Sequence, residues 1–160
     1  MHHSKLVFAY GSNMDPAQMR KRCPQSDLSW FIAEARGWKL CFPRRSDKRK
    51  GGVGSIVRDG GRSVWGVVFS VCRRDLITLD SFEGVPGSYE RDRVDVIDQQ
   101  GLTYRVWTYF AVAADKPPRE YSPHKDYIDL YVRGAKYFGL PQDYVDFLRS
   151  LTPIAQGKKR

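Results

Sequence analysis

A chain of 160 residues is long enough for one domain with a hydrophobic core and too short for two of ordinary size. Hydrophobic residues make up 41% of it and aromatic residues 13%, so we expect a packed globular fold rather than a disordered chain. No apolar run approaches the ~20 residues that cross a bilayer. The apolar run near the start is too short for a signal peptide, so we expect a cytoplasmic protein with no membrane partner.

The formal net charge is +9, and much of the excess lies in the stretches Arg44–Lys50 and Lys158–Arg160. Both flank glycines or the chain end, so we expect a mobile loop and a frayed tail. Basic segments of this kind bind RNA nonspecifically, but they also form solvated surfaces that aid solubility, and the latter reading is favoured over a nucleic-acid partner. We expect a single domain over residues 1–160, with a core over about 5–151 and a basic tail over 155–160.

Cysteine and histidine give no sign of a metal centre. Cys23, Cys41 and Cys72 are widely spaced and odd in number, which fits reduced, partly buried thiols better than a disulfide framework. No two of them form a C-x-x-C pair, and the adjacent His2 and His3 alone make a poor metal site. We therefore expect no metal ligands in this chain.

The first predicted element is a buried strand over Leu6–Ala9 that ends in a sharp turn at Tyr10-Gly11-Ser12-Asn13. A helix is expected around Asp15–Arg22, because Asp caps free amides and Pro16 suits the first helical position. A strand, a glycine turn and a helix N-terminus leave several N–H groups pointing one way, a geometry that binds anions. Most turns of this composition only connect elements, so this pattern alone does not predict a site.

Three extended segments are expected in the middle of the chain, over residues 28–42, 53–58 and 63–72. The third is apolar on both faces, which is typical of a buried strand, and its Gly66 indicates a bend or the close approach of another backbone. Asp59-Gly60-Gly61 predicts a turn between the last two segments. A short helix over Arg73–Asp80 follows and ends before Glu83-Gly84.

The alternating segment Tyr89–Asp98 turns at Gln99-Gln100-Gly101 into Leu102–Val112, which predicts an antiparallel hairpin. Apolar residues at spacings of three and four then predict a helix with the inward face Tyr127, Leu130, Tyr131, Gly134, Ala135 and Phe138. Gly139 suits a left-handed C-cap, and Pro141 starts a last helix. Together these elements predict one α+β domain, an antiparallel sheet rolled into a small barrel with helices packed around it.

Glu83 stands between Phe82 and Gly84, just past the predicted helix. This setting suits a carboxylate at the edge of an apolar pocket, where partial desolvation raises the pKa above the reference value of ~4.3 and makes it a usable base. An ordinary exposed glutamate at a helix end fits the same segment. The segment alone leaves both interpretations open.

Four motifs occur in order along the chain: Phe8-Ala9-Tyr10-Gly11-Ser12-Asn13-Met14, Val64-Trp65-Gly66-Val67-Val68, Leu79-Asp80…Glu83-Gly84-Val85…Tyr89, and Gly134-Ala135-Lys136…Gly139-Leu140-Pro141. Together they resemble the γ-glutamylcyclotransferase family. The resemblance runs from Leu6 to about Leu151. The Tyr-Gly-Ser-Asn turn and the Glu-Gly pair are specific in combination, whereas neither is decisive singly.

The resemblance implies a small antiparallel or mixed β-barrel surrounded by helices, with the substrate at the barrel mouth. It implies Glu83 as the catalytic acid–base residue and Asp80 as a residue that caps or braces its turn. The substrate-binding residues that it implies are Val7, Phe8, Ala9, Tyr10, Gly11, Ser12, Asn13, Tyr89 and Tyr127. Family resemblance and the aromatic helical face are also compatible with a homodimer.

The chemistry of such an enzyme needs few groups. In a γ-glutamyl amide the α-amino nitrogen attacks its own γ-carbonyl and closes a five-membered ring, so no Ser or Cys nucleophile, metal or cofactor is expected. Glu83 would take a proton from the amine and hand it to the leaving group, while amides around Gly11–Asn13 would stabilise the oxyanion. The products would be 5-oxoproline and a free amine or amino acid.

Several alternatives stay open. Glutathione-specific and γ-glutamylamine-specific cyclotransferases are related activities, and Asn13 argues mildly against the former, whose turn motif is shorter and lacks Asn. Removal of a γ-glutamyl protecting group from a biosynthetic intermediate is another. A non-catalytic barrel that binds RNA or acidic metabolites is motivated by Arg44–Lys50 and the net charge. The sequence does not identify the leaving group, although the basic character of Phe42–Gly52 favours an acidic substrate tail.

Overall fold

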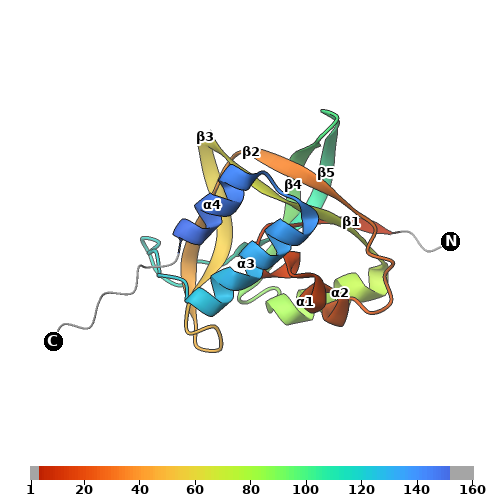
Figure 1. Ribbon diagram of the computed structural model, residues 1–160. Coiled ribbons are helices and arrows are strands. Elements are labelled where there is room, and N and C mark those ends of the chain that lie inside the picture. The colour runs from red at the N-terminus through yellow and green to blue at the C-terminus, as the bar shows by residue number, and fades with distance from the viewer. Residues whose placement is uncertain (1–3, 152–160) are drawn as a thin grey trace.

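The computed structural model describes residues 4–151, in which five strands close into a barrel in the order β1, β3, β2, β4, β5 (Figure 1). The strands are β1 (Lys5–Ala9), β2 (Trp30–Ser46), β3 (Gly51–Val71), β4 (Tyr89–Asp98) and β5 (Thr103–Ala111). Neighbours pair antiparallel except β1 and β5, which run parallel where the barrel closes. The expected mixed barrel is confirmed.

Helices cover one side and one end of this barrel. They are η1 (Ser12–Met14), α1 (Pro16–Arg22), α2 (Arg73–Glu83), α3 (Lys125–Phe138) and α4 (Gln142–Ser150). In Figure 1, α3 and α4 lie together along the barrel, while α1 and α2 lie side by side below it. Among residues 4–151, no helix is both long and apolar enough to span a membrane. The basic tail expected over 155–160 lies outside the described residues.

The turn expected at Asp59-Gly60-Gly61 is wrong, because β3 is one continuous strand through this point. Its pairing with β2 shifts instead: Arg36 faces Ser63, and Trp38 faces Arg58. The residues between bulge out opposite Gly37, whose φ is +81°. Glycine-rich polar segments suit a β-bulge as well as a chain reversal, and the sequence pattern does not separate the two.

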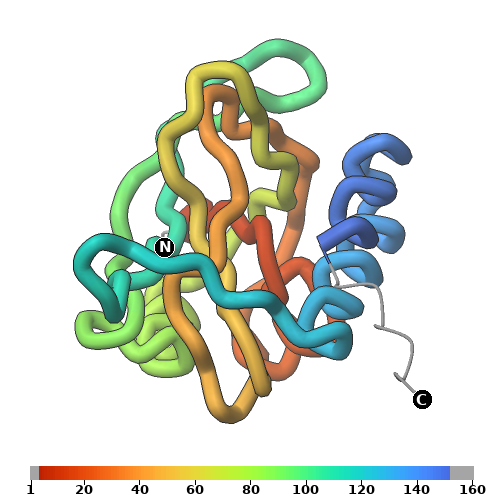
Figure 2. Tube along the Cα trace, turned by 90° about the vertical axis from the view of Figure 1, so that its left-hand side faces the viewer, coloured from red at the N-terminus to blue at the C-terminus, as the bar shows by residue number. Residues whose placement is uncertain are grey.

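The stretch Arg44–Lys50 is also more ordered than a loop. Residues 44–46 end β2, residues 47–50 form the turn, and Gly51 begins β3. Figure 2 shows the segment 112–124 crossing this hairpin. Tyr121 N–H donates to Phe42 O over 2.9 Å, and Gly52 N–H donates to Ser122 O over 2.9 Å. The crossing segment therefore holds the base of the basic hairpin in place.

The core has two parts that follow from strand alternation. Val7 packs in the cluster that joins the barrel to the helices, whereas its neighbour Phe8 packs in a cluster built from barrel residues. Gly66 in β3 allows the close approach that the sequence indicates, since a Cβ there would lie 2.4 Å from Ala9 O. All three cysteines are free thiols, as expected.

A close contact at a glycine packs α3 against η1. A Cβ on Gly134 of α3 would lie 2.3 Å from Met14 O, so only glycine lets α3 pack this closely on η1. Gly139 ends α3 with φ +80°, as the C-cap pattern predicts. At the other side, α2 runs on through Glu83 instead of ending before it, so that glutamate is the last helical residue.

Candidate active site

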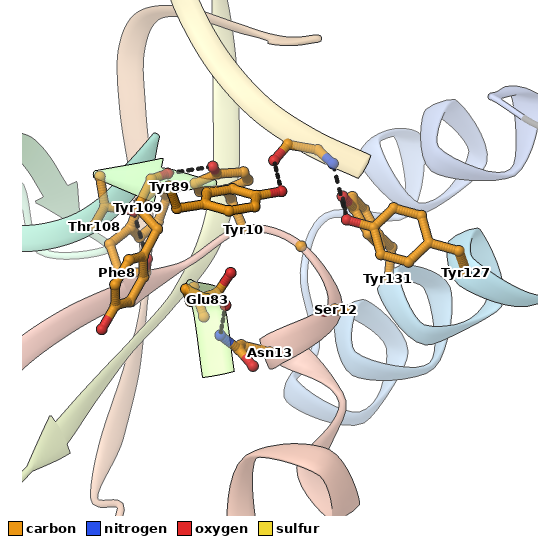
Figure 3. Close-up of a pocket in the computed structure, with 13 residues that line it drawn as sticks. Phe8, Tyr10, Ser12, Asn13, Glu83, Tyr89, Thr108, Tyr109, Tyr127 and Tyr131 are labelled. Atoms are coloured by element: carbon orange, nitrogen blue, oxygen red, sulfur yellow. Dashed lines mark hydrogen bonds between the residues drawn. The ribbon is translucent and has the colours of Figure 1, made fainter. Parts of the chain in front are cut away.

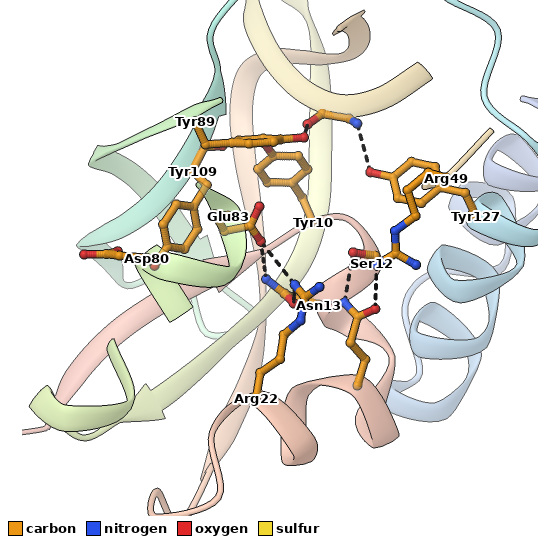
Figure 4. Close-up of polar contacts among 12 residues, drawn as sticks. Tyr10, Ser12, Asn13, Arg22, Arg49, Asp80, Glu83, Tyr89, Tyr109 and Tyr127 are labelled. Atoms are coloured by element: carbon orange, nitrogen blue, oxygen red, sulfur yellow. Dashed lines mark hydrogen bonds and ion pairs between the residues drawn. The ribbon is translucent and has the colours of Figure 1, made fainter. Parts of the chain in front are cut away.

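Glu83 is positioned by the way α2 ends. Gly84 takes a left-handed conformation with φ +71°, Gly84 N–H donates to Ser81 O, and Val85 N–H donates to Asp80 O. These bonds form the Schellman pattern that stops a helix at a defined residue. The Glu83 side chain is only 15% exposed and turns toward the first turn of the chain (Figure 4).

Among the described residues, the side chains of Asn13 and Arg22 make polar contacts with the Glu83 carboxylate. Asn13 Nδ2 donates to Glu83 Oε1 over 2.9 Å, and Arg22 Nη1 lies 3.5 Å from the same oxygen. Asn13 comes from η1 and Arg22 from the last turn of α1. The turn that the sequence singles out and the glutamate 70 residues later are thus in direct contact.

The orientation of the Asn13 amide is set by its neighbours. Its Oδ1 accepts hydrogen bonds from Gln18 Nε2 and from Arg22 Nη1, each over 3.0 Å, so that Nδ2 faces Glu83. Gln18 Oε1 in turn accepts from Arg49 Nη2 over 2.9 Å. A hydrogen-bonded chain therefore runs from the tip of the β2–β3 hairpin through Gln18 and Asn13 to the carboxylate (Figure 4).

The pKa of Glu83 is raised above its ordinary value, chiefly because burial disfavours the charged form. The Arg22 guanidinium and the Asn13 hydrogen bond oppose the shift without cancelling it, and the nearby Asp80 adds to it. The position at the C-terminus of α2 acts in the same direction as burial, because the helix dipole is negative there. The result is a carboxylate suited to accept and return a proton.

The first turn contributes free backbone donors. Ser12 and Asn13 begin η1, and the first N–H groups of a helix have no partner within it. Across residues 4–151, no hydrogen bond uses the N–H groups of Gly11, Ser12 or Asn13 as donors. Gly11 keeps the backbone accessible, since a Cβ there would come within 3.0 Å of Tyr131 Oη. These three adjacent residues line a common space.

That space is a narrow cavity of about 40 Å³, here called the inner cavity (Figure 3). Its walls are aromatic and its floor is the first turn. The lining residues are Phe8, Ala9, Tyr10, Gly11, Ser12, Asn13, Gly54, Glu83, Tyr89, Thr108, Tyr109, Tyr127 and Tyr131. Burial raises the pKa of Tyr10, Tyr89 and Tyr131 well above the usual phenol value, so these walls stay neutral.

Two tyrosines clamp the backbone of Gly54 at one side of the inner cavity. Tyr89 Oη donates to Gly54 O over 2.8 Å, and Gly54 N–H donates to Tyr127 Oη over 2.9 Å (Figure 3). Tyr131 Oη then donates to Tyr127 Oη over 2.8 Å. This clamp joins β3, β4 and α3, so the aromatic wall is fixed by three elements.

Asp80 supports the site from outside the inner cavity. Its Oδ1 accepts from Tyr109 Oη over 2.6 Å and from Arg91 Nε over 2.9 Å. Tyr109 O accepts a hydrogen bond from Tyr10 Oη at 2.5 Å. Asp80 therefore braces the α2 end and the tyrosine wall together, in line with the bracing role expected for it.

The inner cavity brings together all the expected site residues except one. Val7 lies on the other face of β1 and packs toward the helices, because neighbouring side chains on a strand point to opposite faces. The sequence motifs do not single out four further lining residues, Gly54, Thr108, Tyr109 and Tyr131. The spacing of Tyr131 one helical turn after Tyr127 is a signal, but the same spacing predicts an ordinary core face.

Thiol and metal chemistry have no support among the described residues. Burial raises the pKa of Cys23 to about 12 and that of Cys41 to about 11, so neither is a ready thiolate. No group of three or more His, Cys, Asp or Glu side chains within residues 4–151 is arranged to hold a metal ion. The side chains that meet at this site are a carboxylate, an amide, a guanidinium and phenols.

Comparison with known proteins agrees with this geometry. A model of the AIG2-like family matches residues 63–148. The γ-glutamylcyclotransferases of Homo sapiens and Bos taurus are 32% and 33% identical over 155 residues, covering 94% of this chain and 80% of each relative. A solved structure of a γ-glutamyl cyclotransferase superposes with a TM-score of 0.86 at 30% identity, over 98% of this chain and 93% of that chain.

A glutathione-specific γ-glutamyl cyclotransferase from yeast shares the fold, with a TM-score of 0.62, 10% identity and coverage of 92% of this chain and 95% of that chain. Identity at that level carries no argument beyond the fold. The mammalian relatives match well above it and over nearly the whole of this sequence. The chain belongs to the γ-glutamylcyclotransferase family.

Proposed function

We propose that this enzyme cyclises the γ-glutamyl group of γ-glutamyl amino acids or amines to 5-oxoproline and releases the amine. The observation that carries the proposal is the contact between Glu83, a buried carboxylate with a raised pKa, and Asn13 of a turn with free backbone donors. The human and bovine relatives are both γ-glutamylcyclotransferases, which supports the same reaction for this chain.

The substrate supplies its own nucleophile. The α-amino nitrogen attacks the γ-carbonyl carbon, a C–N bond closes the five-membered ring, and the C–N bond to the leaving amine breaks. Positioning contributes much of the rate in such an intramolecular reaction, because the substrate chain must be held folded. The narrow aromatic cavity around Tyr10, Tyr89 and Tyr127 suits this task.

Glu83 moves the proton in both directions. It removes a proton from the substrate α-amino group as attack begins and, once protonated, returns it to the nitrogen that departs. A pKa raised by burial favours this exchange, since the protonated carboxyl must be accessible at working pH. Asn13 and Arg22 hold one carboxylate oxygen, which leaves the other free for the substrate.

The first turn is proposed to stabilise the oxyanion that forms on the γ-carbon. Its backbone donors at Gly11, Ser12 and Asn13 have no protein acceptor among the described residues. Fixed donors of this kind lower the barrier because they need no reorganisation as charge develops. Val7 is not included among the proposed substrate-binding residues, because its side chain packs toward the helices and does not line the inner cavity.

The test is to incubate the purified protein with a panel of γ-glutamyl dipeptides and amines and to quantify 5-oxoproline. Glu83→Gln is expected to lower kcat by ~10²–10⁴-fold, the usual loss on removing a general base. Glu90→Gln is the matched control, since Glu90 is exposed on β4. The absence of product from every panel member, or full activity in Glu83→Gln, would contradict the proposal.

Two further expectations stay predictions. A homodimer is tested by light scattering coupled to size-exclusion chromatography, and a cytoplasmic location by fractionation of the cells that make the protein. Neither bears on the reaction proposed for Glu83.

A further inference from the structure

A second cavity, here called the outer cavity, opens directly beside the inner one. Its volume is about 340 Å³, against about 40 Å³ for the inner cavity. The two share Ser12, Glu83, Tyr89 and Tyr127. Glu83 thus stands at the junction, so a substrate with its scissile amide at Glu83 places its glutamyl part in the inner cavity and its leaving group in the outer one.

The outer cavity is strongly basic. Five cationic side chains line it, and among its described lining residues Glu83 is the one carboxylate. The cations are Arg22, Arg44, Arg45, Lys48 and Arg49. Four of them come from the β2–β3 hairpin, whose base is held by the crossing segment 112–124.

Two of these cations are already engaged with carboxylates. Arg22 Nη1 lies 3.5 Å from Glu83 Oε1, and Arg45 Nη1 lies 2.5 Å from Asp47 Oδ1. Arg22 is therefore held by the catalytic site, and Arg45 faces its neighbour in the turn. Neither provides a free positive charge for a ligand.

The other three cations form no ion pair within 4.0 Å of a carboxylate among residues 4–151. Arg44 Nη1 donates to the neutral Val112 O over 3.3 Å. Arg49 donates to the Gln18 amide oxygen and lies over the Tyr127 ring, with 5.5 Å between the guanidinium carbon and the ring centroid. Lys48 makes no ion pair in the described part of the chain. Neutral acceptors position two of these charges without neutralising them.

We propose that the outer cavity selects acidic leaving groups, namely amino acids with a side-chain carboxylate in addition to the α-carboxylate. The inference rests on the reaction proposed above and adds the class of amine that is released. A single α-carboxylate engages at most part of a cluster with three unpaired cations. A dicarboxylic amino acid such as glutamate or aspartate provides two anionic groups, and charge-assisted bonds to guanidinium are the strong class of hydrogen bond.

The first experiment compares kcat/KM for γ-glutamyl-glutamate with that for γ-glutamyl-glutamine, whose leaving group has the same shape and the same α-carboxylate but a neutral side chain. The acidic substrate is expected to be favoured by roughly 10- to 100-fold, and the advantage to shrink as salt is added. γ-Glutamyl-lysine, with a cationic leaving group, is expected to be the poorest of the three. Equal values for the glutamate and glutamine substrates would overturn the inference.

The second experiment locates the selection. Arg44→Gln combined with Lys48→Gln is expected to lower the ratio of the two kcat/KM values by roughly 10-fold. Arg105→Gln is the charge control, because Arg105 is 71% exposed on β5 and does not line the cavity. A ratio that stays at the wild-type value in the double variant would overturn the inference. Failure of the underlying reaction is distinct, since no γ-glutamyl substrate would then yield 5-oxoproline.

Discussion

Asn13 and Glu83 are joined by a 2.9 Å hydrogen bond from the amide nitrogen to Oε1, across 70 residues of chain. This bond favours the ionised carboxylate and opposes the effect of burial on its pKa. The turn therefore does more than line a cavity, because it also tunes the base. Two variants of Asn13 test its effect on the pKa of Glu83.

Asn13→Ala is expected to raise the pKa of Glu83 further, because one hydrogen bond to the charged form is lost. The acidic limb of the kcat/KM pH profile should move to higher pH, and activity should fall about 10-fold near the wild-type limb. Asn13→Asp should move the limb further than Asn13→Ala, since it adds a like charge beside the carboxylate. A limb that stays in place in both variants would show that Asn13 does not set this pKa.

Arg22→Gln tests the ion pair separately. The guanidinium 3.5 Å from Glu83 Oε1 lowers the pKa of that carboxyl, so its removal should also move the acidic limb upward. Lys21→Gln is the matched control, because it removes one cation from the preceding position in α1, where the side chain is exposed. The control should keep the wild-type profile. Equal profiles for the two variants would rule out a local effect of Arg22.

Much of the fold could be predicted because its signals are local. The first strand, the Asp15 cap, the β4–β5 hairpin and the Gly139 C-cap all depend on residues a few positions apart. The Asp15 side chain accepts from Gln18 N–H, as a capping residue should. Short sequence patterns indicate the type and the ends of such elements, although each element is stabilised by pairing or packing with distant segments.

The rest depends on contacts between distant segments. Whether Asp59-Gly60-Gly61 reverses the chain or bulges is decided by pairing with β2, which no local pattern reveals. Arg22, Arg49 and Tyr109 reach the Glu83 region only because the barrel closes and the hairpin folds over it. The sequence could therefore name the turn and the base, but it could not name Arg22, Arg49 and Tyr109 around them.

The free energy of unfolding should depend on pH because the pKa of Glu83 is raised in the native state. The native state binds a proton more tightly than the unfolded chain, whose Glu pKa is ~4.3. Between that value and the native pKa, stability therefore falls as pH rises, and the loss persists above the native pKa. Glu83→Gln removes the charge, so its stability relative to wild type should increase over this interval.

Denaturant unfolding of wild type and Glu83→Gln from pH 4 to pH 8 measures this difference. Glu90→Gln again serves as the control, since it removes a carboxylate from an exposed position on β4. A Glu83→Gln variant whose stability follows wild type at every pH would mean that ionised Glu83 is fully compensated by Arg22 and Asn13.

Gly54→Ala tests the tyrosine clamp. A Cβ at this position would lie 2.0 Å from Tyr131 Oη, so the ring must move and the hydrogen bonds of Gly54 to Tyr89 and Tyr127 must weaken. We expect a loss of about 1–3 kcal/mol in the free energy of unfolding, typical of forced overpacking. The same displacement should raise KM for γ-glutamyl substrates, because the inner cavity wall shifts.

Gly60→Ala is the matched control, since a Cβ there meets no atom within 4 Å. Equal stability and KM in the two variants would mean that the clamp does not shape the cavity.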